Sequence, residues 1–286
     1  MSTIAEYRRF YAEEIQVVSN LASPAVVAAL ATVAREQFLP PGPWTIRGEA
    51  DFQGPPRQTA DADPRRVYHN VAVAIDASRM LFNGAPSVVA MAIDALRINA
   101  GDRVLHIGTG LGYYTALLAN CVGPSGHVVG IEVDETLADG ARRHLADVPW
   151  VEVRHGNAAD LAGESFDVIL VNAGVTHPLP AWLDALADAG RMIVPITATM
   201  GSIPIGKGPM ILLTKNGSTE KLPARITGFV AIYSAVGVRD DATNAVVGQA
   251  LAKAPFAAVK SFRRDAHPPD ATCWLHGADG CFSLKD

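Results

Sequence analysis

Three glycines at alternating positions are the residues with the clearest chemical meaning in this sequence. Gly108, Gly110 and Gly112 follow the short apolar run at 104–107 and precede an apolar-rich segment with helical character. Glycines let a ligand approach the backbone without interference from a Cβ atom, and a helix begins with N–H groups that lack helical partners. A dinucleotide fingerprint would require a glycine at position 113, where Tyr113 stands. The pattern therefore indicates a nucleotide-binding turn of another kind.

An acidic residue ends the next apolar run, about 20 positions beyond the glycines, as in nucleotide-binding folds. Glu132 closes the stretch at 127–131, and a carboxylate there can accept hydrogen bonds from both hydroxyl groups of a ribose. The alternative is an ordinary solvated acid after a strand. The G-x-G-x-G spacing is the form usual in methyltransferases that use S-adenosyl-L-methionine, and together with Glu132 it favours this cofactor.

Two later runs with strand character also end in polar residues. The run at 150–155 leads to Asn157, which we expect at the adenine edge, and the run at 166–171 leads to Asn172, which we expect in the methyl-transfer pocket. Open α/β sheets collect ligands at such strand ends, although Asn also simply suits turns. The residues expected to contact the cofactor are His106, Gly108, Thr109, Gly110, Gly112, Tyr113, Glu132, Val133, Asn157, Ala158 and Asn172.

The elements that must position these residues read as an α/β fold, a doubly wound Rossmann-like methyltransferase sheet with N-terminal helices and a C-terminal extension. Residues 4–38 show a helical apolar face with a break at Ser23-Pro24, and the Pro- and Gly-rich stretch 40–70 favours a long ordered loop or lid. A final strand pair is expected at 210–215 and 229–233.

The expected division of the chain has three parts. Residues 1–77 hold the N-terminal helices and a substrate-side loop, residues 78–240 form the cofactor-binding core, and residues 241–286 form an extension docked on that core. Within the extension, the sequence predicts a helix near 243–253 and an irregular tail around 270–284. Trp274, Leu275 and Phe282 are apolar, so this tail is expected to pack against the domain.

Several segments together resemble the protein-L-isoaspartate O-methyltransferase family, over roughly positions 20 to 235. The matching segments are 35–41, 85–96, 99–105, 166–169 and 188–196. The resemblance implies a methyltransferase that uses S-adenosyl-L-methionine (EC 2.1.1.-). It also points to the segment around Ala85-Pro86 as the substrate loop.

Departures from the family pattern bear on the acceptor. Gly84 stands where the family usually carries Ser or Thr, a hydroxyl implicated in isoaspartyl recognition, so repair of isoaspartyl residues is not expected. His106 replaces the usual acid of the glycine motif, and Asn157 replaces a common Asp. His106 either hydrogen-bonds toward the methionine part of the cofactor or is a packed histidine.

A carboxylate acceptor suits a site without a dedicated base, because carboxyl groups titrate near pH 4 and are already anionic at neutral pH. We therefore expect methylation of a carboxylate on a peptide or small metabolite. The candidate acceptor-side residues are His69, Asn70, Asn83 and Asn172, and of these His69, Asn83 and Asn172 are the candidates for catalytic roles. The alternatives are N- or O-methylation of a natural product, for which His69 would be the base, and a cofactor-binding protein without turnover.

Composition excludes other classes. The chain has 286 residues, 49% hydrophobic residues and a net charge of −5, and no basic stripe with interleaved aromatics appears, so a nucleic-acid partner is not expected. No apolar run is long enough for a bilayer and the N-terminus lacks the order of a secretion signal, so we expect a cytoplasmic location without a membrane partner. The sequence leaves the oligomeric state open.

The three cysteines do not suggest a disulfide framework in a chain of this length. Cys273, His276 and Cys281 have zinc-like spacing, but a fourth ligand is not evident and His267 is only a guess. The sequence therefore predicts no metal.

Overall fold

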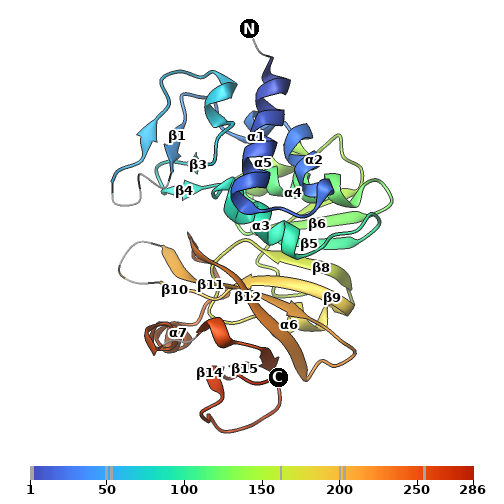
Figure 1. Cartoon of the computed structure of the whole chain (residues 1–286), viewed down its shortest axis with the longest axis vertical. Helices are drawn as coiled ribbons and strands as arrows, with labels where there is room; N and C mark the ends of the chain where they lie inside the picture. The colour runs from blue at the N-terminus through green and yellow to red at the C-terminus, as the bar shows by residue number, and fades with distance from the viewer. Residues whose placement is uncertain are drawn as a thin grey trace. The chain divides into compact units, whose positions relative to one another are not determined.

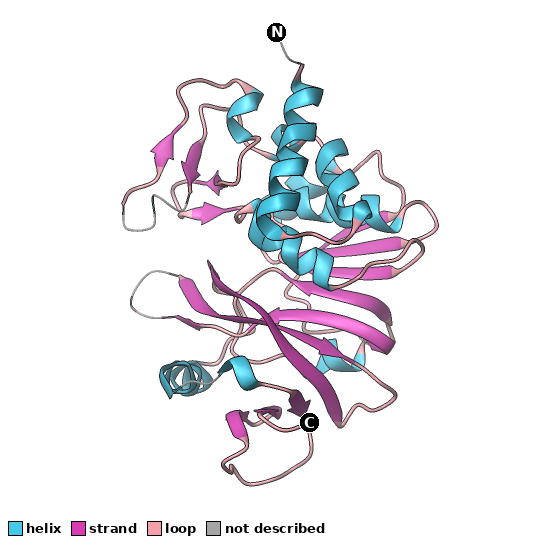
Figure 2. Cartoon of the chain, viewed as in Figure 1, coloured by secondary structure: helices cyan, strands magenta, loops and turns pink. Residues whose placement is uncertain are grey.

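The structure, a computed structural model, describes residues 3–48, 51, 54–161, 163–199, 201, 204–253 and 256–286. The chain forms two units, and each draws on two segments of the sequence. The first unit holds residues 1–101 and 109–154, and the second holds 102–108 and 155–286. Figure 1 follows the chain through its elements, and Figure 2 separates helices from strands.

The N-terminal helices of the first unit begin where the sequence predicts. Helix α1 (Ile4–Ser19) starts with a capping box, in which Thr3 Oγ1 accepts the Glu6 N–H and the Glu6 carboxylate accepts the Thr3 N–H. Helix α2 (Pro24–Thr32) starts after Ser23, whose side chain caps it. The predicted break at Ser23-Pro24 is confirmed, because proline suits the first turn of a new helix and cannot continue the previous one.

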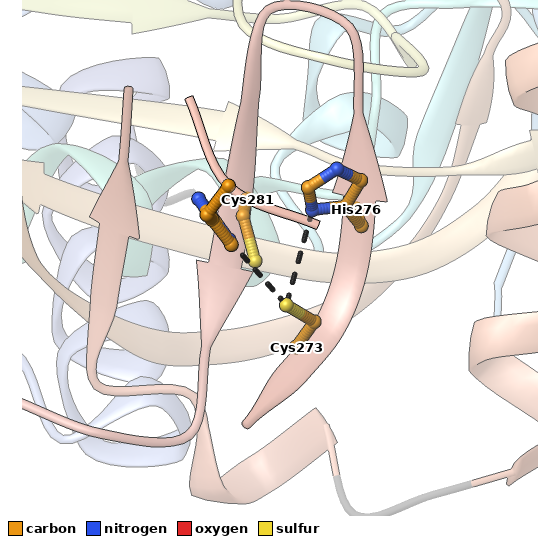
Figure 3. Close-up of side chains that lie close together, drawn as sticks. Cys273, His276 and Cys281 are labelled. Carbon is orange, nitrogen blue, oxygen red and sulfur yellow. Dashed lines mark hydrogen bonds between the residues drawn. The ribbon is translucent and has the colours of Figure 1, made fainter. Parts of the chain in front are cut away.

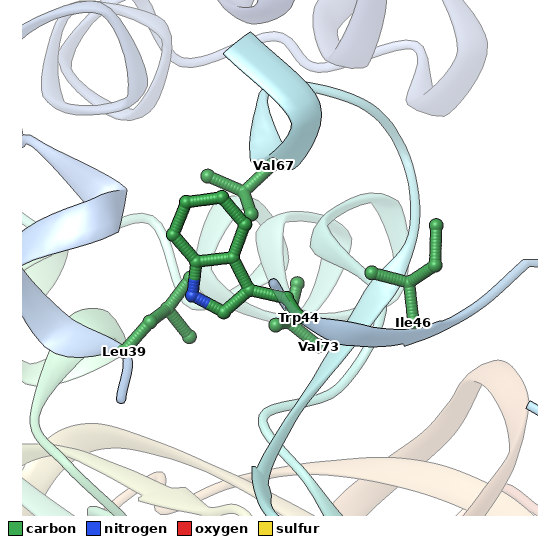
Figure 4. Packing of buried hydrophobic residues seen from close by; sticks show 5 residues of the cluster. All are labelled: Leu39, Trp44, Ile46, Val67 and Val73. Atoms are coloured by element: carbon green, nitrogen blue, oxygen red, sulfur yellow. The ribbon is translucent and has the colours of Figure 1, made fainter. Parts of the chain in front are cut away.

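The stretch 40–70, expected to be a long loop, contributes two strands to a small antiparallel sheet. The strands of this sheet are β1 (Thr45–Arg47), β2 (Arg57–Gln58), β3 (Ala72–Asp76) and β4 (Leu81–Phe82), in the order β2-β1-β3-β4. A hydrophobic cluster supports it, made of Leu39, Trp44, Ile46, Val67 and Val73 (Figure 4). The loop prediction was therefore wrong for β1 and β2, where the buried Trp44 and Ile46 pack into this cluster. Residues 49, 50, 52 and 53 lie outside the described residues.

The rest of the first unit carries helices and two neighbouring strands. Its helices are α3 (Pro86–Ala95), α4 (Tyr113–Val122) and α5 (Glu135–His144), and its strands are β6 (His127–Glu132) and β7 (Val151–His155). The last residue of β7, His155, is counted with the second unit. Helix α4 is buried along almost its whole length, as its apolar sequence predicts.

The second unit contains a mixed sheet. Strands β5 (Arg103–Ile107), β8 (Phe166–Val171) and β9 (Leu186–Pro195) are parallel, and α6 (Pro180–Asp184) lies between β8 and β9 in sequence. Strands β11 (Ile205–Thr214) and β12 (Lys221–Tyr233) add antiparallel, with the short β10 (Ala198–Thr199) paired to β11. The predicted strand pair is confirmed and both strands are longer than expected, but the pair is not the final one, because three more strands follow it.

The C-terminal segment extends this sheet instead of forming an irregular tail. After α7 (Asp241–Lys253), strands β13 (Ser261–Arg263), β14 (Cys273–Gly277) and β15 (Gly280–Ser283) continue it in the order β12-β13-β15-β14. The prediction of irregular structure was wrong because a tight turn pairs β14 with β15. Trp274, Leu275 and Phe282 are buried, as expected. Among the described residues, no helix combines the length and the apolarity needed to cross a bilayer.

Candidate functional site

In the first unit, the glycine turn has a backbone conformation that only glycine adopts readily. Gly110 and Gly112 lie in the left-handed region, with φ of +55° and +97°. A Cβ atom on Gly110 would lie 3.1 Å from Cδ1 of Ile75. Gly112 is the N-cap residue of α4. It has no side chain that could accept a hydrogen bond from the first N–H groups of that helix. The N–H groups of Gly110 and Gly112 donate to Glu132 and to the carbonyl of Thr109, so internal hydrogen bonds fix the backbone of the turn.

Glu132, at the end of β6, is tied to this turn. Its Oε2 accepts the N–H of Gly110 at 2.8 Å, and its Oε1 accepts the N–H of Asp134 at 3.1 Å. Burial raises the pKa of the carboxyl group above its ordinary value, while these backbone hydrogen bonds oppose the rise. A carboxylate has about four acceptor positions, so Glu132 retains capacity for ribose hydroxyls.

Two other predicted contacts in the first unit have buried side chains. The methyl group of Thr109 packs over β6, where a Cβ on Gly130 would lie 2.6 Å from it. The Tyr113 side chain is buried in the unit, with its hydroxyl 3.3 Å from that of Tyr11 and its ring beside Phe38. The side chains of Thr109 and Tyr113 are therefore part of the packed interior of the unit. Val133 is 39% exposed.

The second unit holds further residues that were predicted to contact the cofactor. His106 lies inside β5 with no exposed surface, and burial lowers its pKa to about 3, so the imidazole is neutral at neutral pH. Gly108 has a φ of +83°, and a Cβ there would lie 3.1 Å from the carbonyl oxygen of Asn172. The N–H of Asn172 in turn donates to the carbonyl of Ile107 at 2.8 Å. Strand ends β5 and β8 are thus held together where Asn172 was predicted to act.

Asn157 and Ala158 form a tight turn after β7. The Asn157 side chain accepts the N–H of Ala159 at 3.1 Å, which is the turn-forming role that was the alternative to ligand binding. Ala158 is buried with a φ of +57°, a conformation that residues with a Cβ rarely adopt. The indole N–H of Trp182 donates to the Ala158 carbonyl at 2.8 Å and holds it there. Such a constrained residue is consistent with a functional turn.

Arg35 organises the acceptor-side candidates of the first unit, a role that the sequence did not assign to it. It has no exposed surface, and its guanidinium donates to the carbonyls of Val67, His69 and Val71 at 2.6, 3.2 and 2.8 Å. It also donates to Oδ1 of Asn83 at 3.3 Å. The sequence signal for this role was the resemblance of segment 35–41 to a family motif. The carbonyl groups that accept hydrogen bonds from Arg35 are distant in sequence, so the contacts themselves could not be predicted.

Asn83 is held so that its donor group faces away from these contacts. Its Oδ1 accepts both the Arg35 guanidinium and the N–H of Val73, which fixes the orientation of the amide. Its Nδ2 is buried and makes no hydrogen bond within the described part of the chain. The neighbouring Asn70 instead caps α3, accepting the N–H of Ser87 at 3.0 Å, and His69 is exposed. Of these three side chains, Asn83 is the best prepared to bind a ligand.

Gly84 lacks the hydroxyl of the family pattern, and its backbone conformation also disfavours the residues that carry one. It has a φ of +81°, so serine or threonine would be strained there. Its carbonyl accepts the hydroxyl of Tyr114 at 3.1 Å, and burial raises the pKa of that hydroxyl well above its ordinary value. Tyr114 is therefore a neutral donor that fixes this loop, another role that was not predicted.

These features fit the expected cofactor. A Cβ atom on Gly110 or Gly112 would lie 3.1 or 3.0 Å from a neighbouring side chain, so the turn requires glycine, and Glu132 combines a fixed position with spare acceptor capacity. In the second unit, Gly108 and Asn172 follow strand ends, whereas His106 lies inside β5. Their contacts with a cofactor stay predictions.

The chain is similar to named proteins along most of its length. The family model "Protein-L-isoaspartate(D-aspartate) O-methyltransferase (PCMT)" matches residues 56–207, more than half of the chain. A protein-L-isoaspartate O-methyltransferase of Ignicoccus hospitalis is 33% identical over 47% of this chain, which spans 65% of that relative's length. Protein-L-isoaspartate O-methyltransferase 1 of Rhodopseudomonas palustris is 33% identical over 69% of this chain and 71% of its own.

The fold comparison agrees. A solved protein-L-isoaspartate O-methyltransferase structure superposes with a TM-score of 0.63 at 22% identity, covering 80% of this chain and 66% of that one. The likeness confirms the predicted α/β, Rossmann-like methyltransferase class. The chain belongs to the protein-L-isoaspartate O-methyltransferase family and is a class I methyltransferase that uses S-adenosyl-L-methionine.

Proposed function

We propose that this enzyme methylates a carboxylate of a peptide or small metabolite and forms a methyl ester. The observation that carries the proposal is the buried Nδ2 of Asn83, a hydrogen-bond donor held in place by Arg35 and Val73. A fixed donor complements the oxygen of an anionic acceptor and not the proton-bearing nitrogen of an amine. The bound cofactor supplies an activated methyl group on its sulfonium.

The protein's contribution is binding and orientation. Glu132 and the glycine turn would hold the cofactor, and Asn83 would orient the acceptor oxygen. A carboxylate is ionised at neutral pH, so no side chain needs to remove a proton from it. This fits the exposed position of His69, whose side chain is the candidate base for the alternative acceptors.

We further propose that isoaspartyl repair is not the main activity. Gly84 has no hydroxyl, and its left-handed backbone disfavours the residues that the family usually carries there. The relatives named protein-L-isoaspartate O-methyltransferase make repair the second candidate. Asn83 is adjacent to Gly84 and offers a donor to either kind of carboxylate.

A methyl-transfer assay with labelled cofactor distinguishes these functions. The acceptors are an isoaspartyl peptide, the same peptide with aspartate, and a cell-extract pool fractionated into peptides and small molecules. We expect base-labile methyl label in the pool and little on the isoaspartyl peptide. Efficient turnover of the isoaspartyl peptide would establish repair, and label that survives mild alkali would show N- or ether O-methylation instead.

Variants at Asn83 test the role assigned to its amide. Asn83→Asp replaces the donor by an acceptor and keeps the contacts to Arg35 and Val73, so we expect kcat/KM to fall at least about 10-fold, as for loss of a hydrogen bond to a charged group. Asn70→Asp is the matched control, because Asn70 is engaged with Ser87. Equal losses in both variants would argue against a specific role for Asn83.

A further inference from the structure

Two cysteines and two histidines converge in the C-terminal segment of the second unit. One ligand atom from each of His267, Cys273, His276 and Cys281 lies within 4.8 Å of every other. Cys273 Sγ is 3.5 Å from Nε2 of His267 and 3.8 Å from Nδ1 of His276. Figure 3 shows Cys273, His276 and Cys281 with their side chains turned toward one another. His267, which the sequence offered only as a guess when it predicted no metal, is thus the fourth group of the cluster.

The backbone explains how these side chains reach one face. His276 on β14 pairs directly with Cys281 on β15, so both side chains project to the same side. Cys273 is three residues before His276, and in a regular strand such residues point to opposite faces. The register shifts between Cys273 and Leu275, and this irregularity brings Cys273 back to the face of His276.

The distances match a shared tetrahedral ion. Zinc binds cysteine sulfur at about 2.3 Å and histidine nitrogen at about 2.0–2.1 Å, which places a sulfur and a nitrogen about 3.6 Å apart in a tetrahedron. The two sulfur–nitrogen distances bracket this value. Ordinary thiol–imidazole hydrogen bonds would join these groups in pairs and would not require all four to converge.

Groups around the cluster are arranged as in a metal site. His267 Nδ1 is 2.8 Å from the carbonyl oxygen of Asp265, so Nδ1 carries the proton and Nε2 is left for a metal. The N–H of Asp270 lies 3.5 Å from Cys273 Sγ, where it would stabilise a thiolate. Arg263 faces Cys281 from β13, but the Asp265 carboxylate, 2.6 Å away, balances its charge.

We propose that His267, Cys273, His276 and Cys281 bind one zinc ion in a structural site. Four protein ligands complete the tetrahedral shell, so no position is left for a reacting water. Two thiolates and two neutral imidazoles also balance the ion's charge. The site joins the β14–β15 hairpin to the preceding segment that contains His267, and zinc binding stabilises this fold because the unfolded chain lacks a preformed site.

Metal analysis of the full chain tests this proposal. The protein is purified without a tag or chelator and measured by inductively coupled plasma mass spectrometry. We expect about one zinc per chain, falling below about a tenth in Cys273→Ser and Cys281→Ser. Cys121→Ser and His127→Ala are matched controls outside the cluster and should keep the zinc. Circular dichroism of each variant reports whether it has folded.

Cobalt replacement gives a second readout on the unmodified sequence, which avoids variants that fail to fold. The wild-type protein, stripped by a chelator and loaded with Co²⁺, should show absorption bands of a tetrahedral cobalt–thiolate centre, and zinc should abolish them. Removal of zinc should also lower the Tm. The proposal is overturned if wild-type protein incubated with zinc binds none, if Cys273 and Cys281 form a disulfide in freshly purified protein, or if both serine variants retain the metal.

Discussion

Glu132 accepts the backbone N–H of Gly110 at 2.8 Å and so fixes the carboxylate at the end of β6 to the glycine turn. Glu132 as a whole is 7% exposed, and its carboxylate also accepts the N–H of Asp134. One residue thus shapes the turn and presents acceptor positions to a ligand. We expect removal of the Glu132 carboxylate to affect ligand binding more than stability, because water can partly solvate the two N–H groups that lose their acceptor.

Glu132→Ala should weaken binding of S-adenosylhomocysteine by roughly 1.5–3 kcal/mol, about 10- to 150-fold in Kd, the loss expected for a charged hydrogen-bond acceptor. Isothermal titration calorimetry measures the change. Glu135→Ala, an exposed acid in the first turn of α5, is the control and should bind normally. Unchanged affinity in Glu132→Ala would remove this residue from the cofactor site.

Gly110→Ala and Gly217→Ala form a matched pair. Both glycines have positive φ, +55° and +72°, so each substitution should cost on the order of 1 kcal/mol in backbone strain. A Cβ on Gly217 meets nothing within 4 Å, whereas one on Gly110 approaches Ile75 and occupies the turn. Urea unfolding should therefore show similar destabilisation, and calorimetry should show weaker cofactor binding in Gly110→Ala only. Equal affinity losses would mean that strain, not ligand contact, explains the effect.

The glycine turn and Glu132 could be predicted because their signal is local. A short apolar strand, positive-φ glycines and a strand-terminal acid lie within about 30 residues, the span of one βαβ unit. Tyr113 shows the limit of this reading. Its place in the motif suggested a ligand contact, but the N-terminal helices supply Tyr11 and Phe38, which pack around its ring from distant positions in the sequence.

The parts that the sequence did not predict depend on non-local contacts. The strands near Trp44 are only two or three residues long, and the surrounding Pro and Gly residues are typical of loops. These strands depend on a hydrophobic cluster that forms only in the folded chain. Arg35 binds carbonyl groups more than 30 residues away, as the separations of its hydrogen bonds show. In the extension, a register shift determines that Cys273 and His276 share a face. Such a shift has no sequence signature.

Arg35→Met should destabilise the protein by on the order of 3–5 kcal/mol, because one buried and three partly buried acceptors lose the Arg35 donor at once. Urea denaturation monitored by fluorescence measures this loss. Arg143→Met replaces an exposed arginine of α5 and should change stability by less than about 0.5 kcal/mol. A similarly small effect at Arg35 would show that its buried hydrogen bonds contribute little.

His106 should make the fold sensitive to acid. Its pKa is lowered to about 3 in the folded protein, and an exposed histidine in the unfolded chain titrates near 6.5. A group with a lowered folded pKa contributes stability that is present above the unfolded pKa and is lost as pH falls toward the folded pKa. Between pH 6.5 and 3 the unfolded state binds one more proton at this site, so stability should fall by up to about 1.4 kcal/mol per pH unit.

The comparison with His106→Leu isolates this contribution from carboxylates that titrate over the same range. Unfolding free energies from urea titrations between pH 7 and 5 should decline more steeply for the wild type than for the variant, since leucine takes up no proton. The difference in slope should approach 1.4 kcal/mol per pH unit below about pH 6. Parallel profiles would mean that the His106 imidazole becomes protonated without unfolding the strand around it, and that burial in β5 does not keep it neutral.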